Sequence, residues 1–164
     1  MKKMLFTMMA ICILFSAFGK KKVNFEKEKA AILTTIEEEK RGYAEKNMPK
    51  MKLHVVDDPT YSWLYADANG HLFNHGFSNQ EKLVKGWWEN SESEFPKQKI
   101  TTNFVELKIF PETAWAVIDV VWAQVENGKI VHERKGMETL FFEKVKGKWK
   151  IACHTVLDKS SYNN

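Results

Sequence analysis

Two titratable residues in the second half of the chain lie in apolar stretches of sequence, where a carboxyl group or an imidazole could act as an acid or a base. Asp119 interrupts the stretch Val117–Val121, and His154 lies between apolar residues of a later β-type run. A carboxyl group buried in such a stretch has a raised pKa, as a general base requires, and an imidazole exchanges protons near neutral pH. We predict Asp119 and His154 as candidate catalytic residues, and as an acid–base dyad if both face one cavity.

Both residues also have a purely structural interpretation. Strand alternation places Asp119 and Trp122 on opposite faces, and because both faces are rich in apolar residues the sequence leaves open which face is inside. Asp119 equally suits a solvated or dimer face, and His154 equally suits a hydrogen bond to a backbone carbonyl. Arg134 and Glu138 are predicted to share a strand face, where they either bind an acid-bearing ligand or form an ion pair of small worth.

Large aromatic side chains are frequent, with six Trp among 164 residues. A cavity lined by indoles suits a flat apolar or amphipathic ligand, which the indole N–H groups would orient. Filling the core is the competing use of the same side chains. The candidate ligand-binding residues are Tyr43, Trp63, Trp87, Trp88 and Trp122.

Sequence motifs for several common kinds of catalytic or binding site are absent. The chain has no H-E-x-x-H motif, no glycine-rich phosphate loop and no G-x-S-x-G motif, so we predict neither a metal site nor a cofactor. The net charge of +4 is modest and acidic residues are spread among the basic ones, which argues against a nucleic-acid groove.

Residues 1–19 have the pattern of a secretory signal peptide. Two lysines precede an apolar run over residues 4–18, and small residues close the segment. The run is shorter than the roughly 20 residues that span a bilayer, so we predict an exported protein, periplasmic or secreted, without stable membrane insertion after cleavage. Cleavage removes Cys12 and leaves Cys153 alone, which excludes an internal disulfide and favours a small core residue.

Residues 20–164 predict one domain in which helices precede strands. A helix starts at the N-cap Asn24 and ends near Asn47, and a short helical turn follows over residues 50–54. A capping box starts a third helix at Asn79. Within the first helix, opposite charges over residues 37–41 at i,i+3 and i,i+4 spacing predict a solvent-exposed face.

The predicted strands lie between and after these helices. A hairpin over residues 61–73 turns at Asn69-Gly70. Four longer β runs follow, joined by short turns, at residues 100–110, 113–126, 130–146 and 149–157. The order predicts an α+β domain with helices on one face of a sheet.

Four passages carry a resemblance to a known family, and one of them is Asp57-Asp58-Pro59, which follows the short second helix. Tyr43-Ala44-Glu45-Lys46-Asn47 ends the first helix, Gly76–Leu83 reads as a glycine followed by a capped third helix, and Gly147–Ile151 followed by His154 reads as a closing strand. Over Asn24 to Leu157 the chain resembles the NTF2-like superfamily, the cone-shaped fold shared by SnoaL-like polyketide cyclases, ketosteroid isomerases and scytalone dehydratases. One departure is that Thr155, not a serine, follows the histidine.

The resemblance implies an NTF2-like cone, in which three N-terminal helices pack on a strongly curved antiparallel sheet around a pocket, with a homodimer formed through the open face of the sheet. This fold hosts enzymes, binders and assembly domains. Our leading prediction is binding of a small apolar or amphipathic molecule. The alternatives are a cofactor-free cyclase, isomerase or dehydratase acting through Asp119 or His154, and a non-catalytic assembly or interaction domain whose cone is filled by its own tryptophans.

Overall fold

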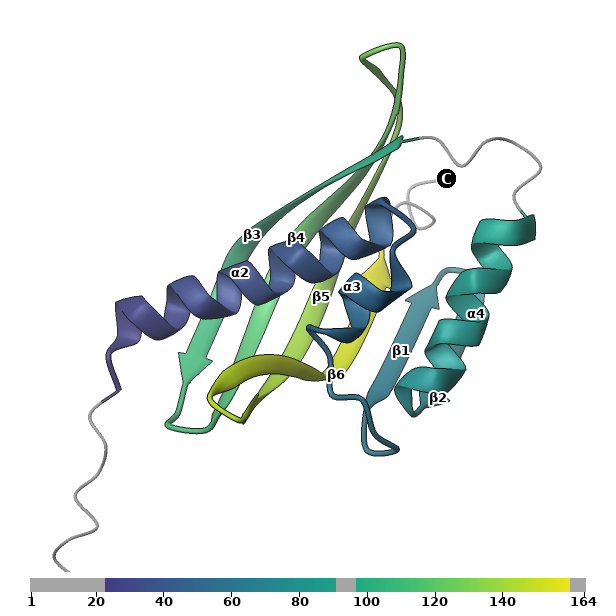
Figure 1. The fold of residues 1–164 in the computed structure, drawn as a ribbon. Coiled ribbons are helices and arrows are strands. Elements are labelled where there is room, and N and C mark those ends of the chain that lie inside the picture. The colour runs from purple at the N-terminus through teal and green to yellow at the C-terminus, as the bar shows by residue number, and fades with distance from the viewer. Residues whose placement is uncertain (1–22, 91–96, 160–164) are drawn as a thin grey trace, which may run out of the picture.

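The computed structural model describes residues 23–90 and 97–159 (Figure 1). The predicted signal peptide, residues 1–19, lies outside these ranges. The described chain contains helices α2 (Phe25–Ala44), α3 (Met48–Lys52) and α4 (Phe77–Asn90), and strands β1 (Ser62–Asp67), β2 (Gly70–His75), β3 (Lys97–Ile109), β4 (Thr113–Glu126), β5 (Lys129–Val145) and β6 (Lys148–Asp158).

Asparagine side chains form hydrogen bonds at the starts of α2 and α4. Asn24 caps α2 by accepting a hydrogen bond from the backbone N–H of Lys27 at 3.2 Å, as the sequence predicts. Helix α4 begins at Phe77, two residues before the predicted start at Asn79. The Asn79 side chain donates to the carbonyl of His75 at 2.7 Å and so ties the first turn of α4 to the end of β2.

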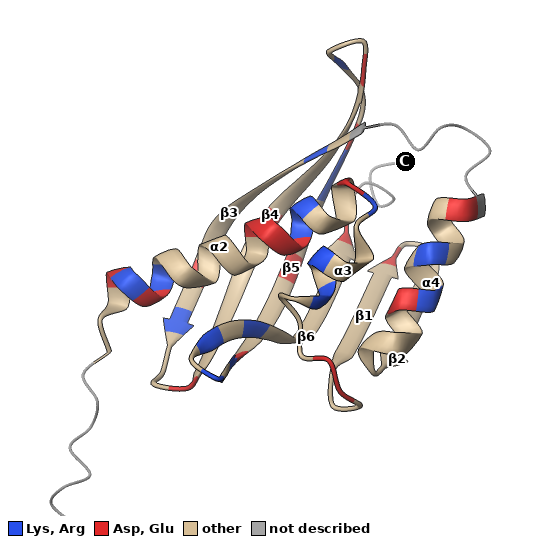
Figure 2. Ribbon diagram, in the orientation of Figure 1, with Lys and Arg blue, Asp and Glu red and all other residues tan. Residues whose placement is uncertain are grey.

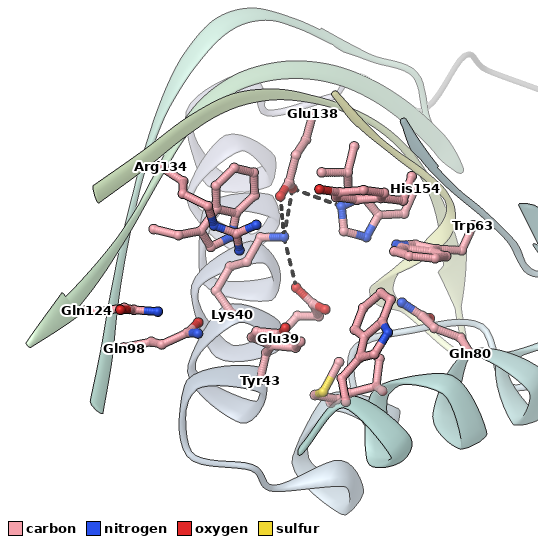
Figure 3. Close-up of a pocket in the computed structure, with 16 residues that line it drawn as sticks. Glu39, Lys40, Tyr43, Trp63, Gln80, Gln98, Gln124, Arg134, Glu138 and His154 are labelled. Carbon is pink, nitrogen blue, oxygen red and sulfur yellow. Dashed lines mark hydrogen bonds and ion pairs between the residues drawn. The ribbon is translucent and has the colours of Figure 1, made fainter. Parts of the chain in front are cut away.

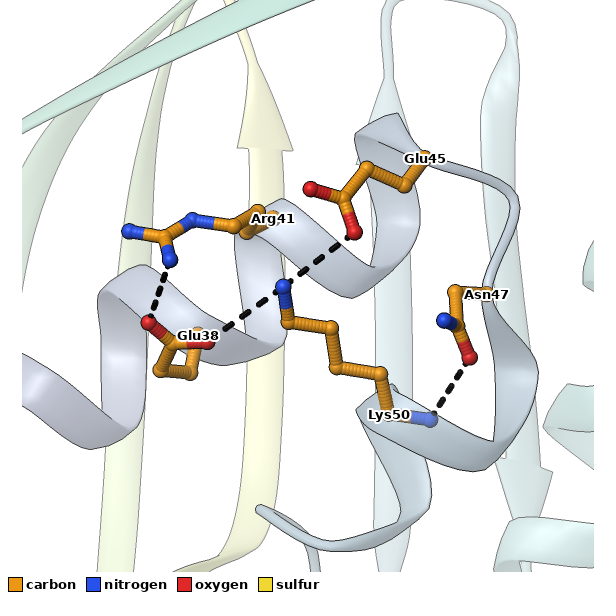
Figure 4. A network of polar contacts seen from close by, with 5 residues as sticks. All are labelled: Glu38, Arg41, Glu45, Asn47 and Lys50. Carbon is orange, nitrogen blue, oxygen red and sulfur yellow. Dashed lines mark hydrogen bonds and ion pairs between the residues drawn. The ribbon is translucent and has the colours of Figure 1, made fainter.

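Helix α3 is held against the end of α2 by a small polar network (Figure 4). The Asn47 side chain caps α3 by accepting from the Lys50 backbone N–H at 3.0 Å, and Pro49 lies in the first turn, where its missing N–H costs nothing. The Lys50 ammonium reaches Glu45 at 3.1 Å and Glu38 at 3.4 Å. Such surface pairs are individually weak, so the network orients α3 more than it stabilises the fold.

The six strands form one mixed sheet in the order β2-β1-β6-β5-β4-β3. Four neighbouring pairs are antiparallel, and β1 runs parallel to β6 with Trp63 opposite His154. The predicted α+β cone is confirmed, but the prediction of a wholly antiparallel sheet missed this pair. The early hairpin docks beside the last strand, a non-local contact that no local pattern encodes.

Two tight turns set the long hairpins. Asn127 and Gly128 have φ values of 49° and 77°, and Lys146 and Gly147 have φ values of 51° and 78°. Positive φ at both central residues defines the type I′ turn, whose twist matches that of paired strands. The register of β4 on β5, and of β5 on β6, follows from these turns.

Register shifts bend the sheet at three points. Val105 of β3, Val131 of β5 and Ala152 of β6 each lack a Cα partner in the neighbouring strand. A β-bulge of this kind bends its strand and increases the local twist. Figure 1 shows the resulting curve, with α2 lying across β3 to β6 and α4 beside β1 and β2.

The core lies between the helices and the concave face of the sheet. Ile32 and Ile36 of α2 are fully buried against Leu140 and Phe142 of β5 and their neighbours in one hydrophobic cluster. In Figure 2 the charged positions gather along α2 and α4 and toward the strand ends. No helix within the described ranges is long and apolar enough to cross a membrane.

Candidate functional site

The concave face of the sheet and the inner sides of α2 and α4 enclose a cavity of about 350 Å³ (Figure 3). Its lining has aliphatic, aromatic and polar side chains, and the aliphatic ones are Met51, Val84 and Val156. The aromatic residues are Tyr43, Trp63, Tyr65, Trp87 and Trp122. The polar and charged residues are Glu39, Lys40, Gln80, Gln98, Gln124, Arg134, Glu138 and His154.

A buried group of charged residues forms one wall of this cavity. The Lys40 ammonium lies 2.8 Å from Oε1 and 2.7 Å from Oε2 of Glu138, and 3.4 Å from Oε2 of Glu39. His154 Nε2 lies 2.9 Å from Oε2 of Glu138. All four residues are buried, with the Glu138 side chain 0% exposed. Figure 3 shows Lys40 at the centre of the group, with Glu138, His154 and Glu39 around it.

The electrostatics of this wall keep Glu138 and Lys40 ionised. Burial alone would raise the pKa of Glu138, but the Lys40 ammonium and His154 outweigh burial and lower it to about 2. Burial alone would lower the pKa of Lys40, but Glu138 and Glu39 outweigh burial and raise it. Mutual compensation of this kind is what permits charges to lie in a low-dielectric interior.

The position of Glu39 and Lys40 corrects the predicted solvent-exposed face of α2. Ile32, Ile36 and Tyr43 form the apolar stripe of this helix, and Glu39 and Lys40 fall inside the same stripe by helical spacing. Both are therefore carried into the core when the stripe packs on the sheet. The interruption of an apolar stripe by two charges was the available sequence signal for the buried group.

His154 points inward because of the bulge in β6. Phe141 of β5 pairs with Cys153, whereas Phe142 pairs with Ile151, so Ala152 is an extra residue. Simple alternation would place Ile151 and His154 on opposite faces, but the extra residue reverses the alternation and both are buried. His154 thereby reaches Glu138, which lies on the adjacent strand.

Asp119 lies on the other face of the sheet. Ile118 and Val120 are buried, whereas the Asp119 side chain is 54% exposed and pairs loosely with Lys159 at 3.6 Å. The structure therefore does not bring Asp119 and His154 together, and the predicted dyad is corrected to a Glu138–His154 pair. The sequence placed Glu138 on the face of Arg134 but did not link it to His154.

Four of the five predicted aromatic residues line the cavity, namely Tyr43, Trp63, Trp87 and Trp122. Trp88 does not line it and instead packs beside Tyr43, with ring centroids 5.9 Å apart. Trp63 stacks on Tyr65 at 6.1 Å and meets the edge of Trp87 at 5.8 Å. These rings border the cavity and do not fill it.

Several buried polar atoms around the cavity lack a hydrogen-bond partner among the residues that the structure describes. They are Gln80 Oε1, Gln98 Oε1 and His154 Nδ1, whereas Glu39 Oε2 has its 3.4 Å ion pair with Lys40. Buried polar groups in proteins are nearly always hydrogen-bonded, so a cluster of exceptions around one cavity indicates a site for a polar ligand group or for ordered water. Residues 23–90 and 97–159 place no group of three or more His, Cys, Asp or Glu where it would hold a metal ion.

A curved six-stranded sheet with three helices on its concave side and one polar-walled pocket defines an α+β cone. No family model and no curated protein matches the sequence. Solved structures do match. An NTF2-like protein of unknown function from Shewanella oneidensis is 14% identical, with 80% of this chain and 99% of that one covered at a TM-score of 0.61.

Two further structures extend the match. An NTF2-like superfamily protein from Salmonella enterica is 17% identical, covering 80% of this chain and 91% of its own at a TM-score of 0.59. A protein of unknown function from Mycobacterium tuberculosis is 10% identical to this chain. The match covers 85% of this chain and 78% of that one, at a TM-score of 0.64. The chain therefore has the NTF2-like fold, and the resemblance seen in the sequence is confirmed at the level of fold.

Proposed function

We propose that this protein binds a small amphipathic molecule in the cavity of its cone. The apolar part of the ligand would pack against the indoles of Trp63, Trp87 and Trp122, and a polar group would meet the wall formed by Glu39, Lys40, Glu138 and His154. The sequence favours a largely apolar ligand. The ligand proposed here differs because one of its sides carries a polar group.

One observation carries this proposal: three buried polar atoms without a hydrogen-bond partner among the described residues share one cavity of about 350 Å³ with an aromatic lining. A cavity that served only as an imperfect core would be lined by apolar side chains and would stay dry. Pockets for small molecules are instead mostly apolar with a few convergent polar groups. The open space between the rings also argues against an assembly domain whose cone is filled by its own tryptophans.

Native mass spectrometry of protein purified from its own host tests this function. We expect one equivalent of a small molecule per chain. Trp87→Ala should lose the ligand because Trp87 lines the cavity and is 38% exposed, so truncation does little to the fold. Trp115→Ala is the matched control, since Trp115 lies in β4 outside the lining. Ligand-free wild-type protein, or equal retention by both variants, would reject the proposal.

A second function, cofactor-free acid–base catalysis, is favoured by one specific contact. His154 Nε2 lies 2.9 Å from Glu138, whose lowered pKa keeps it anionic, and a carboxylate fixes the orientation and tautomer of an imidazole. His154 Nδ1, unpartnered among the described residues, would then exchange a proton with a substrate. A cyclase, isomerase or dehydratase activity that persists in His154→Asn would exclude this role.

Export and dimerisation complete the proposal. We infer that residues 1–19 direct secretion and are removed, which N-terminal sequencing of the exported protein would test. The convex face of the sheet exposes Phe141 at 50% and Leu157 at 42%, and Val105 of β3 is 56% exposed. Exposed apolar patches mark interaction surfaces, so we propose a homodimer through this face. A monomeric mass by native mass spectrometry at micromolar concentration would reject the dimer.

A further inference from the structure

The charged side chains around the cavity do not balance. Figure 3 shows that charged groups from α2 and β5 converge on one wall. The lining holds the permanent cations Lys40 and Arg134 and the carboxylates Glu39 and Glu138, and a third carboxylate, Asp158, lies outside the lining and pairs with Arg134. Counting these permanent charges alone, three carboxylates face two cations, so one carboxylate has no cation of its own.

The contacts identify which carboxylate carries the excess. Asp158 accepts from Arg134 at 3.0 Å and from the Tyr65 hydroxyl at 3.1 Å, so its charge is paired. Lys40 lies much closer to Glu138, at 2.7 and 2.8 Å, than to Glu39, at 3.4 Å. Glu39 is 3% exposed, and in the described part of the chain its Oε2 has the 3.4 Å ion pair with Lys40 but no hydrogen bond of normal geometry. Glu39 is thus the buried carboxylate with the least compensation.

A buried carboxylate without a full partner is costly, because a low-dielectric interior replaces none of the lost hydration. A cationic ligand group would supply the missing charge and the missing hydrogen bond in one contact. Two further buried acceptors in the same cavity, Gln80 Oε1 and Gln98 Oε1, are placed to take further N–H donors. The surrounding indole and phenol faces attract cations as well.

We infer that Glu39 is the receptor for a protonated nitrogen, and that the ligand of this cone is a small amphipathic amine. The inference rests on the proposed function, because it names the chemical class of the molecule held in the same cavity. The amine would donate to Glu39, and its apolar part would lie against Trp63 and Trp87. A carboxylate ligand would meet the negative charge of Glu39, and a neutral alcohol would leave Glu39 without a cation of its own.

Three isosteric probes separate these ligand classes: 2-phenylethylamine, 2-phenylethanol and phenylacetate, titrated into the wild-type protein at pH 7 and followed by calorimetry or tryptophan fluorescence. We expect the amine to bind about tenfold to a hundredfold more tightly than the alcohol, as a buried charge-assisted hydrogen bond allows, and phenylacetate to bind most weakly. This preference should persist in 0.5 M salt, where the Debye length is only about 4 Å and pairs between exposed charges are screened.

A pair of variants on one helix tests the assignment to Glu39. Glu39→Gln should abolish the preference for amine over alcohol, chiefly by weakening the binding of the amine. Glu37→Gln, an exposed position two residues away, should keep the preference and controls for the general loss of one negative charge. Circular dichroism and urea unfolding would establish that both variants are folded; if Glu39→Gln is not, Glu39→Asp should keep the preference with weakened amine binding.

Distinct results overturn distinct conclusions. Equal or tighter binding of the alcohol or of phenylacetate, as expected if His154 carries the balancing proton, would overturn the inference and leave the proposed function standing. A preference that survives Glu39→Gln, or the failure of all three probes at millimolar concentration, would overturn it as well. A host-purified protein that carries no small molecule would reject the proposed function itself.

Discussion

The two faces of the same sheet treat the same kinds of residue in opposite ways. On the concave face Glu138 is fully buried and shares Lys40 and His154. On the convex face Asp119 is 54% exposed on its side chain and has a loose contact with Lys159. The two carboxylates lie on adjacent strands, since Ile118 pairs with Glu138 and Asp119 with Met137. One step along a strand therefore separates a carboxylate held in a charged pocket from one in water.

The difference teaches that composition around a residue does not fix its environment in a sheet. Asp119 lies in the more apolar stretch of sequence, yet Glu138, in a strand rich in charges, is the buried one. What decides is the helix that covers one face. Helix α2 crosses the concave side (Figure 1) and brings Lys40 to Glu138, whereas the Asp119 side chain stays 54% exposed on the opposite face. A buried carboxylate is tolerated only where a partner arrives with it.

The largest expected effect comes from breaking the charged group at its centre. Lys40→Met removes the one ammonium between Glu138 and Glu39 and leaves two buried carboxylates without it, so we expect a loss of about 3–5 kcal/mol in the free energy of unfolding. Lys159→Met, which removes the partner of Asp119 on the convex face, should change it by less than about 0.5 kcal/mol. Urea unfolding at pH 7 measures both. Comparable losses in the two variants would contradict the contrast between the faces.

The second-largest expected effect is a pH-dependent loss of stability that comes from Glu138 on the concave face. Glu138 has a pKa lowered from 4.5 to about 2 in the folded protein, so its stabilising contribution is complete above about pH 4.5 and is lost as the pH falls toward 2. We expect Glu138→Gln to be less stable than wild type by about 2–3 kcal/mol at pH 7, with the difference shrinking through that window. Unfolding curves between pH 2 and pH 7 measure it, and a difference independent of pH would refute the assignment.

A third effect concerns the close packing behind the cavity. A Cβ added to Gly136 of β5 would lie 2.6 Å from the Leu157 carbonyl oxygen and 2.6 Å from the Trp122 ring. Since the carbonyl belongs to the backbone of β6, we expect Gly136→Ala to cost about 1–3 kcal/mol and to displace Trp122, visible as a shift in tryptophan emission. Gly86→Ala in α4 meets nothing within 4 Å and should stabilise by about 0.5–1 kcal/mol. Equal stability of the two variants would contradict this packing.

Local patterns predicted most of the fold. The N-cap Asn24, the short turns that join the last three β runs, and the strand at residues 113–126 are all set by neighbours in sequence, and all agree with the structure. The parallel pairing of β1 with β6 was not predicted, because it joins segments about ninety residues apart. Non-local pairing depends on how the finished layers fit together, which periodicity does not report.

The candidate site was predicted less completely, for two physical reasons. The aromatic lining was found because large apolar side chains face the interior wherever the fold leaves room. Glu39 and Lys40 were missed because charged side chains are rarely buried, so their spacing was interpreted as solvent-exposed. The inward direction of His154 depends on the extra residue Ala152, and a bulge that shifts alternation by one residue leaves no periodic signal.

The smallest expected effect sharpens the comparison from the convex side. Asp119→Asn removes a charge from a side chain that is half exposed and whose nearest cation is 3.6 Å away, so we expect stability to change by less than about 0.5 kcal/mol. Binding of 2-phenylethylamine should also be unchanged, because the sheet separates Asp119 from the cavity. Calorimetric titration and urea unfolding of this variant beside wild type measure both quantities. A large loss of binding in Asp119→Asn would mean that the carboxylate of the convex face contributes to the site, and the contrast between the two faces would then fail where the structure makes it sharpest.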